Sequence, residues 1–327
     1  MVCRRMSGAL KNLALILVWI ALYASLWIAL PDSFGTYRNF ETIARQTIIV
    51  GLAAVGMTYV IVVGAIDLSV GSLVALVTVV VALLIQAGLP PGAAAAGGLA
   101  VGALAGLING TILSRLKVGA FIVTLASLLA FRGIAKGLAG EQKVEAPDTW
   151  LSALTASVSV EHPWLGLPIG AWILLVLAIA ASWALRYTAF GRHTVAVGSN
   201  EATAKMCGIN PDAVRIWVFV IAGAFFGLAG IMQFGRLTVG DPTVAVGLEL
   251  SVIAAVVIGG ASLSGGEGSV FGSLLGALIM ATIASGASQL GLPNWIQEIV
   301  TGVIILGAVA LDRWRVRRAA NLRVGET

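Results

Sequence analysis

Long apolar runs separated by short polar segments make up most of the chain. A helix needs about 20 mostly apolar residues to cross the hydrocarbon core of a bilayer, where only internal hydrogen bonds satisfy the backbone. Ten such runs stand at Leu13–Leu30, Thr42–Val63, Leu68–Leu89, Ala93–Leu113, Ala120–Ala135, Leu165–Leu185, Ile216–Phe234, Leu248–Ser262, Ser269–Leu290 and Trp295–Leu311. The eighth run is short, so a broken or re-entrant helix is one interpretation of it. The pattern predicts an all-α polytopic membrane protein with about ten transmembrane helices.

Composition and the spacing of the polar segments indicate one membrane domain over residues 1–327. Hydrophobic residues make up 59% of the 327 residues and charged residues 11%, whereas soluble domains average roughly 45–50% and 25%. Two longer polar interruptions remain, at 136–164 and 186–215, and neither is long enough to bury a core of its own. We expect the first to be a periplasmic loop and the second a cytoplasmic loop.

The distribution of Lys and Arg predicts the orientation, because basic residues resist translocation and stay cytoplasmic. With both termini inside, 14 of the 20 basic residues are cytoplasmic. These are Arg4, Arg5, Lys11, Arg115, Lys117, Arg186, Arg192, Lys205, Arg215, Arg313, Arg315, Arg317, Arg318 and Arg323. The net charge of +5 is then explained by the basic residues that set the membrane orientation, and no nucleic-acid partner is needed to explain it. We predict a multi-pass membrane protein with an uncleaved first helix.

Residues that could carry chemistry are few and scattered. Cys3 and Cys207 both fall on the predicted cytoplasmic side, where thiols stay reduced, so a disulfide is not expected. His162 and His193 lie in opposite loops, too far apart to share a metal ion. The sequence contains no set of nucleophile, base and orienting residue. We therefore expect no catalytic residue, metal ion or cofactor in this chain.

Glycine recurs every four residues in two of the apolar runs. The first series is Gly98, Gly102, Gly106 and Gly110, and the second is Gly268, Gly272 and Gly276. Such ridges let helices approach closely, and tight packing inside one subunit is favoured over a glycine-lined pore. A weak echo also relates Val63–Ser72 to Ile258–Gly266. Duplication and chance are equally consistent with so short a match.

One stretch, LSGGE at Leu263–Glu267, differs by a single residue from the LSGGQ motif of ABC-type ATPases. That motif acts only opposite a P-loop, whose backbone amides and lysine hold the phosphates. None of the five lysines lies in a P-loop pattern, and the stretch falls between two apolar runs. We interpret it as a tight helix junction, in which Ser269 caps the ninth helix.

The 186–215 loop contains the signals of a short exposed helix followed by the start of another. Asn200 is a good N-cap and Gly208 a good C-terminal stop, with Glu201 and Lys205 as a favourable i, i+4 pair. Asn210 is placed to cap a second helix that begins at the next residue, Pro211.

The short helix has one small apolar face. Ala202, Met206 and Ile209 share this face, so the helix can offer an apolar surface to a partner. The alternative from the residues alone is a surface helix that packs on its own subunit.

Four segments resemble the permease subunits of ribose-type ABC sugar importers. They are GRHTVAVGSNEATAKMCGINPDAVRIWVFVIAGAFFGLAGI, GMTYVIVVGAIDLSVGSLVAL, GLINGTILSRLKVGAFIVTLASLLAFRGIA and VIAAVVIGGASLSGGEGSVFGSLLGALI. The resemblance covers most of the chain in the expected order. Two departures are that the family usually has a proline where Gly119 or Ala120 stands, and that the outer loop around 141–164 matches nothing in the family.

The resemblance implies an ABC importer permease fold and a set of partners. It makes the 200–208 segment a coupling helix that docks on a separate ATPase subunit, which binds ATP and Mg²⁺. The expected coupling residues are Asn200, Glu201, Ala202, Lys205, Met206 and Gly208. Further expected partners are a periplasmic sugar-binding protein, a second permease chain that makes a homodimer or a heterodimer, and membrane lipid.

Polar residues at membrane depth are costly and often functional, which nominates a translocation pathway. The candidates are Asp67, Ser69, Asn109, Glu249 and Glu298. Structural roles are the alternative to substrate contact. Asp67 can cap the third helix, Asn109 can bond between helices, and Glu249 and Glu298 can lie at solvated helix ends.

The leading hypothesis is the transmembrane subunit of an ATP-driven importer for a monosaccharide or polyol, such as ribose, xylose, arabinose or galactose. The runner-up is a branched-chain amino acid or nucleoside permease of the same architecture. An ion-coupled secondary transporter is the hypothesis from another class, and it usually requires a buried carboxylate or histidine chain. The sequence does not name the sugar.

Overall fold

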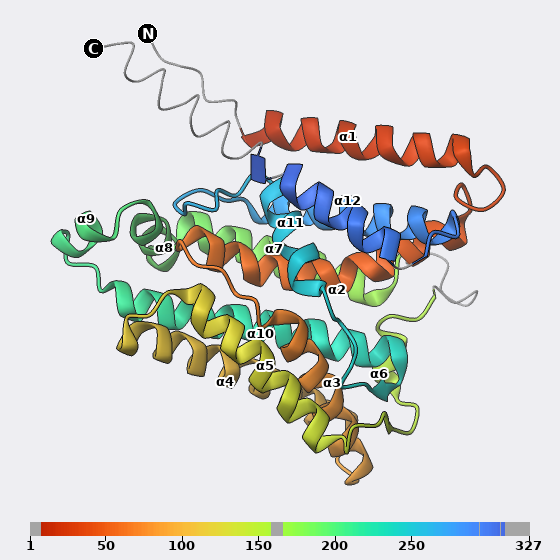
Figure 1. Cartoon of the computed structure of the whole chain (residues 1–327), viewed down its shortest axis with the longest axis horizontal. Coiled ribbons are helices and arrows are strands. Elements are labelled where there is room, and N and C mark those ends of the chain that lie inside the picture. The colour runs from red at the N-terminus through yellow and green to blue at the C-terminus, as the bar shows by residue number, and fades with distance from the viewer. Residues whose placement is uncertain (1–7, 158–165, 294, 308, 311–327) are drawn as a thin grey trace.

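The computed structural model describes residues 8–157, 166–293, 295–307 and 309–310, and within them the chain is mostly helical (Figure 1). The long helices are α1 (Gly8–Ala29), α2 (Tyr37–Val62), α3 (Val70–Gln86), α4 (Pro91–Leu116), α5 (Ala120–Leu138), α7 (Ile169–Tyr187), α10 (Pro211–Leu237), α11 (Leu248–Ile258), α12 (Val270–Gln289) and a last helix, Trp295–Gly307. The short elements are α6 (Trp150–Ala153), α8 (Ala189–Ser199), α9 (Glu201–Met206), β1 (Val144–Glu145) and β2 (Val239–Gly240). Cys3, Arg4, Arg5, His162 and the basic residues from Arg313 to Arg323 lie outside the described residues.

Each of the ten predicted apolar runs corresponds to a helix. Within the described residues, seven helices are long and apolar enough to cross a membrane, while α3, α11 and Trp295–Gly307 are shorter apolar helices. The eighth run was predicted to extend to Ser262, but α11 ends at Ile258, because Gly260 takes a left-handed conformation (φ +92°) that stops the helix. With 11 residues, α11 spans about 16 Å, roughly half of a bilayer core.

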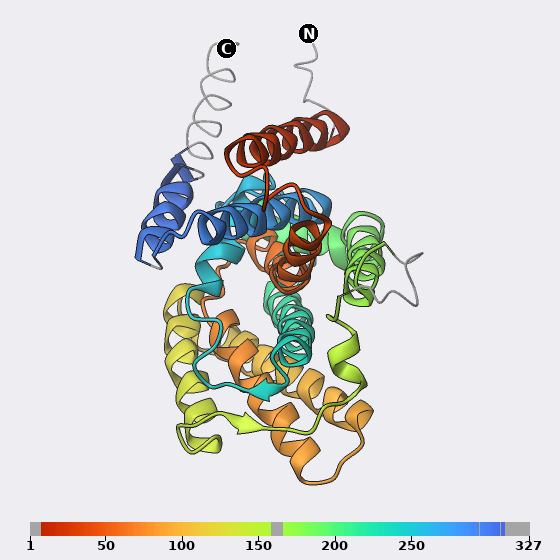
Figure 2. The same cartoon turned by 90° about the vertical axis from the view of Figure 1, so that its right-hand side faces the viewer.

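The helices form a bundle in which α2 is the central element. Of its most apolar stretch 78% is buried within the chain, against 28% for α5 and for α7. Figure 2 shows α2 and α10 inside the bundle, with α4, α5, α7 and α1 around them. The outer helices expose large apolar side chains such as Leu129 and Trp183. This inverted pattern suits a lipid environment, where exposed apolar surface carries no penalty.

The glycine ridge of α4 packs against α10 inside the same chain. A Cβ atom on Gly106 would overlap the Phe219 carbonyl oxygen, and one on Gly223 would lie 3.0 Å from the Gly106 nitrogen. In the second ridge, Gly272 faces Gly259 and Gly276 faces Ala255, so α12 approaches α11 equally closely. The packing interpretation of both ridges is therefore confirmed.

The LSGGE stretch forms the junction between α11 and α12. Gly265 and Gly266 have positive φ angles of +83° and +78°, and the Ser269 hydroxyl accepts a hydrogen bond from the Gly272 N–H at 3.1 Å. The stretch lies beside its echo partner: Gly266 N–H donates to the Val62 carbonyl at 2.8 Å. The predicted tight junction with a Ser269 cap is confirmed.

Candidate functional site

The 186–215 loop is built as predicted and lies at one end of the molecule. In Figure 1, α8 and α9 stand at the left end, opposite α6 at the right. The Asn200 side chain accepts a hydrogen bond from Thr203 N–H at 2.9 Å, and Gly208 ends α9 with φ +82°. The Asn210 side chain accepts from the N–H groups of Asp212 and Ala213 at 3.1 and 3.2 Å, with Pro211 as the first helical residue. These contacts give the loop a defined shape.

A bidentate ion pair fastens α9 to the start of α10. Both guanidinium nitrogens of Arg215 donate to the Glu201 carboxylate, one of them at 3.1 Å. This hydrogen bonding holds the pKa of the Glu201 carboxyl below its usual value. The expected pairing of Glu201 with Lys205 therefore needs correction: Arg215 is the ion-pair partner, because its planar fork fits a carboxylate better than an ammonium group does. Lys205 adds a weaker electrostatic attraction.

Two of the three residues on the apolar face of α9 are open to solvent, while Ile209 is half-buried against the core. Met206 is 88% exposed and Ala202 is also exposed, while Ala204 on the other side of the helix is buried. The alternative in which this face packs on its own subunit is therefore wrong for Ala202 and Met206. A largely exposed methionine on a capped helix is typical of a surface that a partner covers.

A polar cavity of about 720 Å³ lies next to the loop. Its walls come from the α4–α5 connection, the start of α10 and the inner side of α9, including Lys117, Glu201, Lys205 and Arg215. Charged groups of both signs line it, so a water-filled space fits it better than an apolar ligand site.

Three predicted pathway residues are joined in one buried hydrogen-bonded network. The Asp67 carboxylate accepts from the N–H and the hydroxyl of Ser69 at 2.8 and 2.6 Å. The Asn109 amide donates to the Ser69 hydroxyl at 3.1 Å and accepts from Ser127 at 2.5 Å. Asp67, Ser69 and Asn109 are each at most 2% exposed. The network links the segment before α3 to α4 and α5, and Ser127 is a member that the sequence analysis missed.

The starts of α3 and α11 meet inside the bundle. A Cβ atom on Gly71 would overlap both the Ala245 carbonyl oxygen and the Glu249 carboxylate. The Glu249 carboxylate has one oxygen that is buried without a hydrogen-bond partner, and it is attracted to Arg132 of α5. Glu249 is half-buried in the first turn of α11, so its interpretation as a solvated helix end holds only in part. Arg132 itself donates to the carbonyls of Pro242 and Val244 at 3.0 and 2.6 Å.

Two turns of the same chemistry precede these two helix starts. Asp241 accepts from the N–H and the hydroxyl of Thr243 at 2.8 and 2.6 Å, as Asp67 does from Ser69. Each turn follows a long helix, α2 or α10, and each precedes a shorter helix, α3 or α11. The sequence analysis had instead paired Val63–Ser72 with Ile258–Gly266. An Asp-x-Ser/Thr turn is too short to be recognised as a repeat in the sequence.

Glu298 does not join these residues. It lies exposed on the last helix, as its interpretation as a solvated residue predicted. Within the described ranges, no group of three or more His, Cys, Asp or Glu side chains is placed to hold a metal ion.

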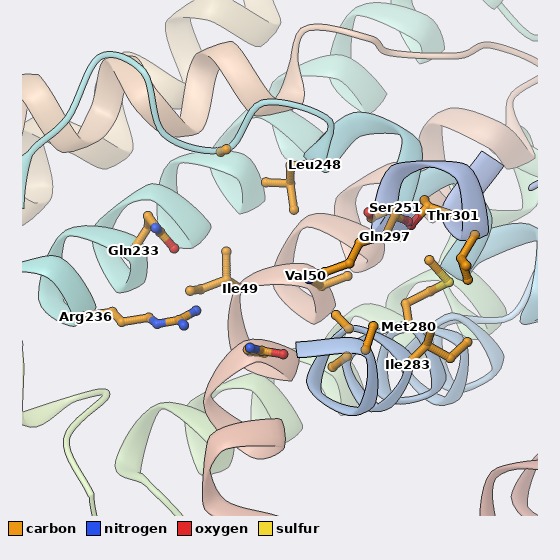
Figure 3. A pocket seen from close by; sticks show the side chains of 16 residues that line it. Ile49, Val50, Gln233, Arg236, Leu248, Ser251, Met280, Ile283, Gln297 and Thr301 are labelled. Atoms are coloured by element: carbon orange, nitrogen blue, oxygen red, sulfur yellow. The ribbon is translucent and has the colours of Figure 1, made fainter. Parts of the chain in front are cut away.

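A second group of polar residues was missed because each stands alone within an apolar run. Gln46, Gln233, Arg236, Ser251, Gln297 and Thr301 line a cavity bounded by α2, α10, α11, α12 and the last helix. Figure 3 shows Gln233 and Arg236 extending from α10 on one side and Ser251, Gln297 and Thr301 gathered on the other. They could have been identified from the sequence because polar side chains are rare within membrane-spanning segments.

Comparison with known proteins identifies the family of the chain. A protein-family model described as "Branched-chain amino acid transport system / permease component" matches residues 39–309. The chain belongs to this permease family. Its resemblance to permeases of ribose-type ABC importers is likewise confirmed by relatives that share nearly the whole length of the permease.

Three of these relatives are named for sugars. The ribose import permease protein of Escherichia coli (strain K12) is 39% identical to the permease over 302 residues, which cover 92% of each chain. The L-arabinose ABC transporter permease protein of Azospirillum brasilense is 34% identical over 95% of the permease and 90% of the relative. The xylose transport system permease protein of Haemophilus influenzae is 34% identical over 87% and 91%. No solved structure matches the permease.

Proposed function

We propose that the permease is the transmembrane subunit of an ATP-driven importer for a monosaccharide, in the bacterial inner membrane. The names of the relatives support the sugar class, since they refer to ribose, L-arabinose and xylose. In this proposal ten apolar segments cross the bilayer, with α11 forming only part of its crossing, and both termini and α9 lie in the cytoplasm. A periplasmic binding protein delivers the sugar at the α6 end, and the permease works as a dimer with itself or with a related chain.

The exposed, rigid α9 is the observation that carries the proposal. Met206 and Ala202 form an apolar tip, and the Glu201–Arg215 pair connects this tip to α10. A separate ATPase that binds ATP and Mg²⁺ would cover the tip and change its position on nucleotide binding. Only a partner with different affinity for two states can drive a change between them, so this contact is where the free energy enters.

A close-packed glycine junction is placed to transmit the movement. Gly198, at the root of the loop, would bring a Cβ atom into overlap with the Val62 carbonyl and to 2.8 Å from the Gly266 nitrogen. Gly265 in turn approaches Gly64. Because packed interfaces switch between arrangements and do not deform smoothly, a displacement of α9 would shift the ends of α2 and α12 together.

The buried polar residues are then structural parts of the pathway wall. Asp67, Ser69 and Asn109 hold the start of α3, while Glu249 and Arg132 hold the start of α11. Both helix starts lie inside the bundle, the arrangement by which many transporters line a central path with broken helices.

The second candidate is a branched-chain amino acid permease of the same architecture. The description of the matching family supports it, whereas the three relatives above favour a sugar. An ion-coupled secondary transporter has less support, because it leaves the exposed tip of α9 without a function.

Transport by the reconstituted complex tests the proposal. Gly208→Val forces a branched side chain into a left-handed backbone at the end of α9, which costs about 1–2 kcal/mol locally. We expect ATP-dependent sugar uptake and co-purification of the ATPase to fall roughly tenfold, a coupling loss of about 1.4 kcal/mol. Glu201→Arg should have the same effect, and uptake should recover in part when Arg215→Glu is added.

The matched control is Gly92→Val, at an exposed glycine with open space around it and no positive φ angle. We expect uptake near that of the unaltered permease for this variant. Normal uptake by both Gly208→Val and Glu201→Arg would overturn the coupling role of α9.

A further inference from the structure

The cavity of Figure 3 contains more polar side chains than a helix contact inside a membrane protein requires. It measures about 220 Å³ and lies between α2, α10, the start of α11, α12 and the last helix. Three glutamines line it, Gln46, Gln233 and Gln297, each from a different helix. Isolated polar groups in apolar segments are costly, so their convergence on one space indicates a binding role.

One of these polar groups has no hydrogen-bond partner among the residues that the structure describes. The side-chain oxygen of Gln46 is buried and accepts no hydrogen bond. A buried acceptor left unpaired costs about 1–3 kcal/mol, which a donor from a bound molecule would recover. The cavity is therefore incomplete as a hydrogen-bonded structure without an occupant.

The charge of the lining disfavours one kind of occupant. Arg236 contributes a guanidinium group to the cavity, with Arg45 close enough to repel it. None of the described residues that line the cavity is acidic. A cation is thus disfavoured, while hydroxyl oxygens can accept from the guanidinium and from the glutamine amides.

The apolar part of the lining and the size of the cavity narrow the choice further. Ile49, Leu248, Met280 and Ile283 offer C–H surface between the polar groups. The volume is below the roughly 300–1,000 Å³ of pockets for drug-sized ligands. One small ring with hydroxyl groups on its edge and C–H groups on its face matches this combination, and a disaccharide is too large.

We propose that this cavity is a transit site that holds one neutral monosaccharide within the permease chain after release from the binding protein. Hydroxyl groups of the sugar donate to Gln46 and accept from Gln233 and Arg236, while the apolar wall contacts the ring. The inference rests on the proposed function and adds a site to it. The site lies apart from the Asp67 network and shares no lining residue with the residues predicted from the sequence.

The test measures the number of sugar molecules translocated per ATP hydrolysed by the complete complex in proteoliposomes. The probes are labelled D-ribose, D-xylose and L-arabinose, each loaded on the cognate binding protein. Ala284→Phe fills the cavity, and Gln233→Leu removes an amide at nearly constant volume. We expect the sugar-to-ATP ratio to fall severalfold in both variants, because hydrolysis then proceeds without a sugar held in transit.

A substitution that only disturbs the fold lowers transport and hydrolysis together and leaves the ratio unchanged. Ala180→Leu, on the exposed face of α7, is the control and should keep the ratio of the unaltered permease. If Ala284→Phe does not reach the membrane, Ala284→Val and Gln46→Leu replace it. An unchanged ratio in the cavity variants would overturn the transit site, whereas absence of ATP-dependent uptake by the unaltered complex would instead overturn the proposed function.

Discussion

Asn109 ties three segments of the chain together with one neutral side chain. Its amide nitrogen donates to Ser69 before α3, and its oxygen accepts from Ser127 on α5. Asn109 is only 1% exposed, so it and its partners are removed from bulk water and depend on one another for their hydrogen bonds. An amide is suited to this place because it carries a donor and an acceptor without a charge.

A double-mutant cycle measures this dependence. Asn109→Leu should destabilise the detergent-solubilised permease by about 1–3 kcal/mol, because Ser127 loses its acceptor and the Ser69 hydroxyl loses one of its two side-chain partners. Ser127→Ala alone should cost less, and the two changes together should fall short of their sum by roughly 0.5–2 kcal/mol. Ser25→Ala, on the exposed part of α1, is the control and should be additive with Asn109→Leu. Additivity in both cycles would contradict the network.

The contact between α4 and α10 depends on which face of each helix carries glycine. Gly102 and Gly106 on α4 meet Gly223 and Gly227 on α10, so the two backbones touch without side chains between them. Such close approach provides dispersion contacts that replace the missing hydrophobic driving force in lipid. The same residue type on the outer face of α5 has no neighbour: a Cβ on Gly133 would meet nothing within 4 Å.

Alanine substitutions should therefore have opposite effects at these two glycines. Gly223→Ala places a methyl group 3.0 Å from backbone atoms of Gly106 and should lower the free energy of unfolding by about 1–3 kcal/mol. Gly133→Ala should raise it by about 0.5–1 kcal/mol, since alanine stiffens the helix at no steric cost. Thermal unfolding of the two purified variants, followed by circular dichroism, provides the measurement. Equal shifts of the same sign would refute the packing argument.

At the scale of the whole molecule, the two ends differ from the sides. The sides of the bundle expose large apolar residues such as Leu129, Val176 and Trp183, whereas the α9 end carries the charged loop and the polar cavity. This distribution fits a molecule with lipid around its sides and water at its ends. It also places Cys207, an exposed free thiol, at the α9 end.

Thiol labelling can determine the orientation of the bundle. In a Cys3→Ser background, a membrane-impermeant maleimide should label Cys207 in inverted membrane vesicles and leave it unlabelled in intact cells. Gln142→Cys, placed in an exposed loop at the opposite end in a background without native cysteines, should give the reverse result. Labelling of Cys207 from the outside of intact cells would show that the predicted orientation is inverted.

Local chemistry was sufficient to predict the caps and the helices. Asn200, Asn210 and Ser269 are N-caps because each side chain bonds to a backbone amide only two or three residues away. The apolar runs are equally local signals, since a helix satisfies its backbone within itself. Boundaries were less accurate where glycine or an Asp-x-Ser turn shortened a helix, as at α3 and α11.

The sequence by itself determined that the chain is a bundle of membrane helices with a 186–215 loop made of short capped helices. Apolar runs and helix caps are signals between residues that are close in the chain. Only the tertiary structure decided that Glu201 pairs with Arg215, that Ser127 completes the Asn109 network, and that Glu249 is half-buried within electrostatic reach of Arg132. It also decided that Gln46, Gln233 and Gln297 share one cavity. These partners are far apart in the chain, and packing of glycine ridges and extended segments brings them together, so no local pattern could have paired them.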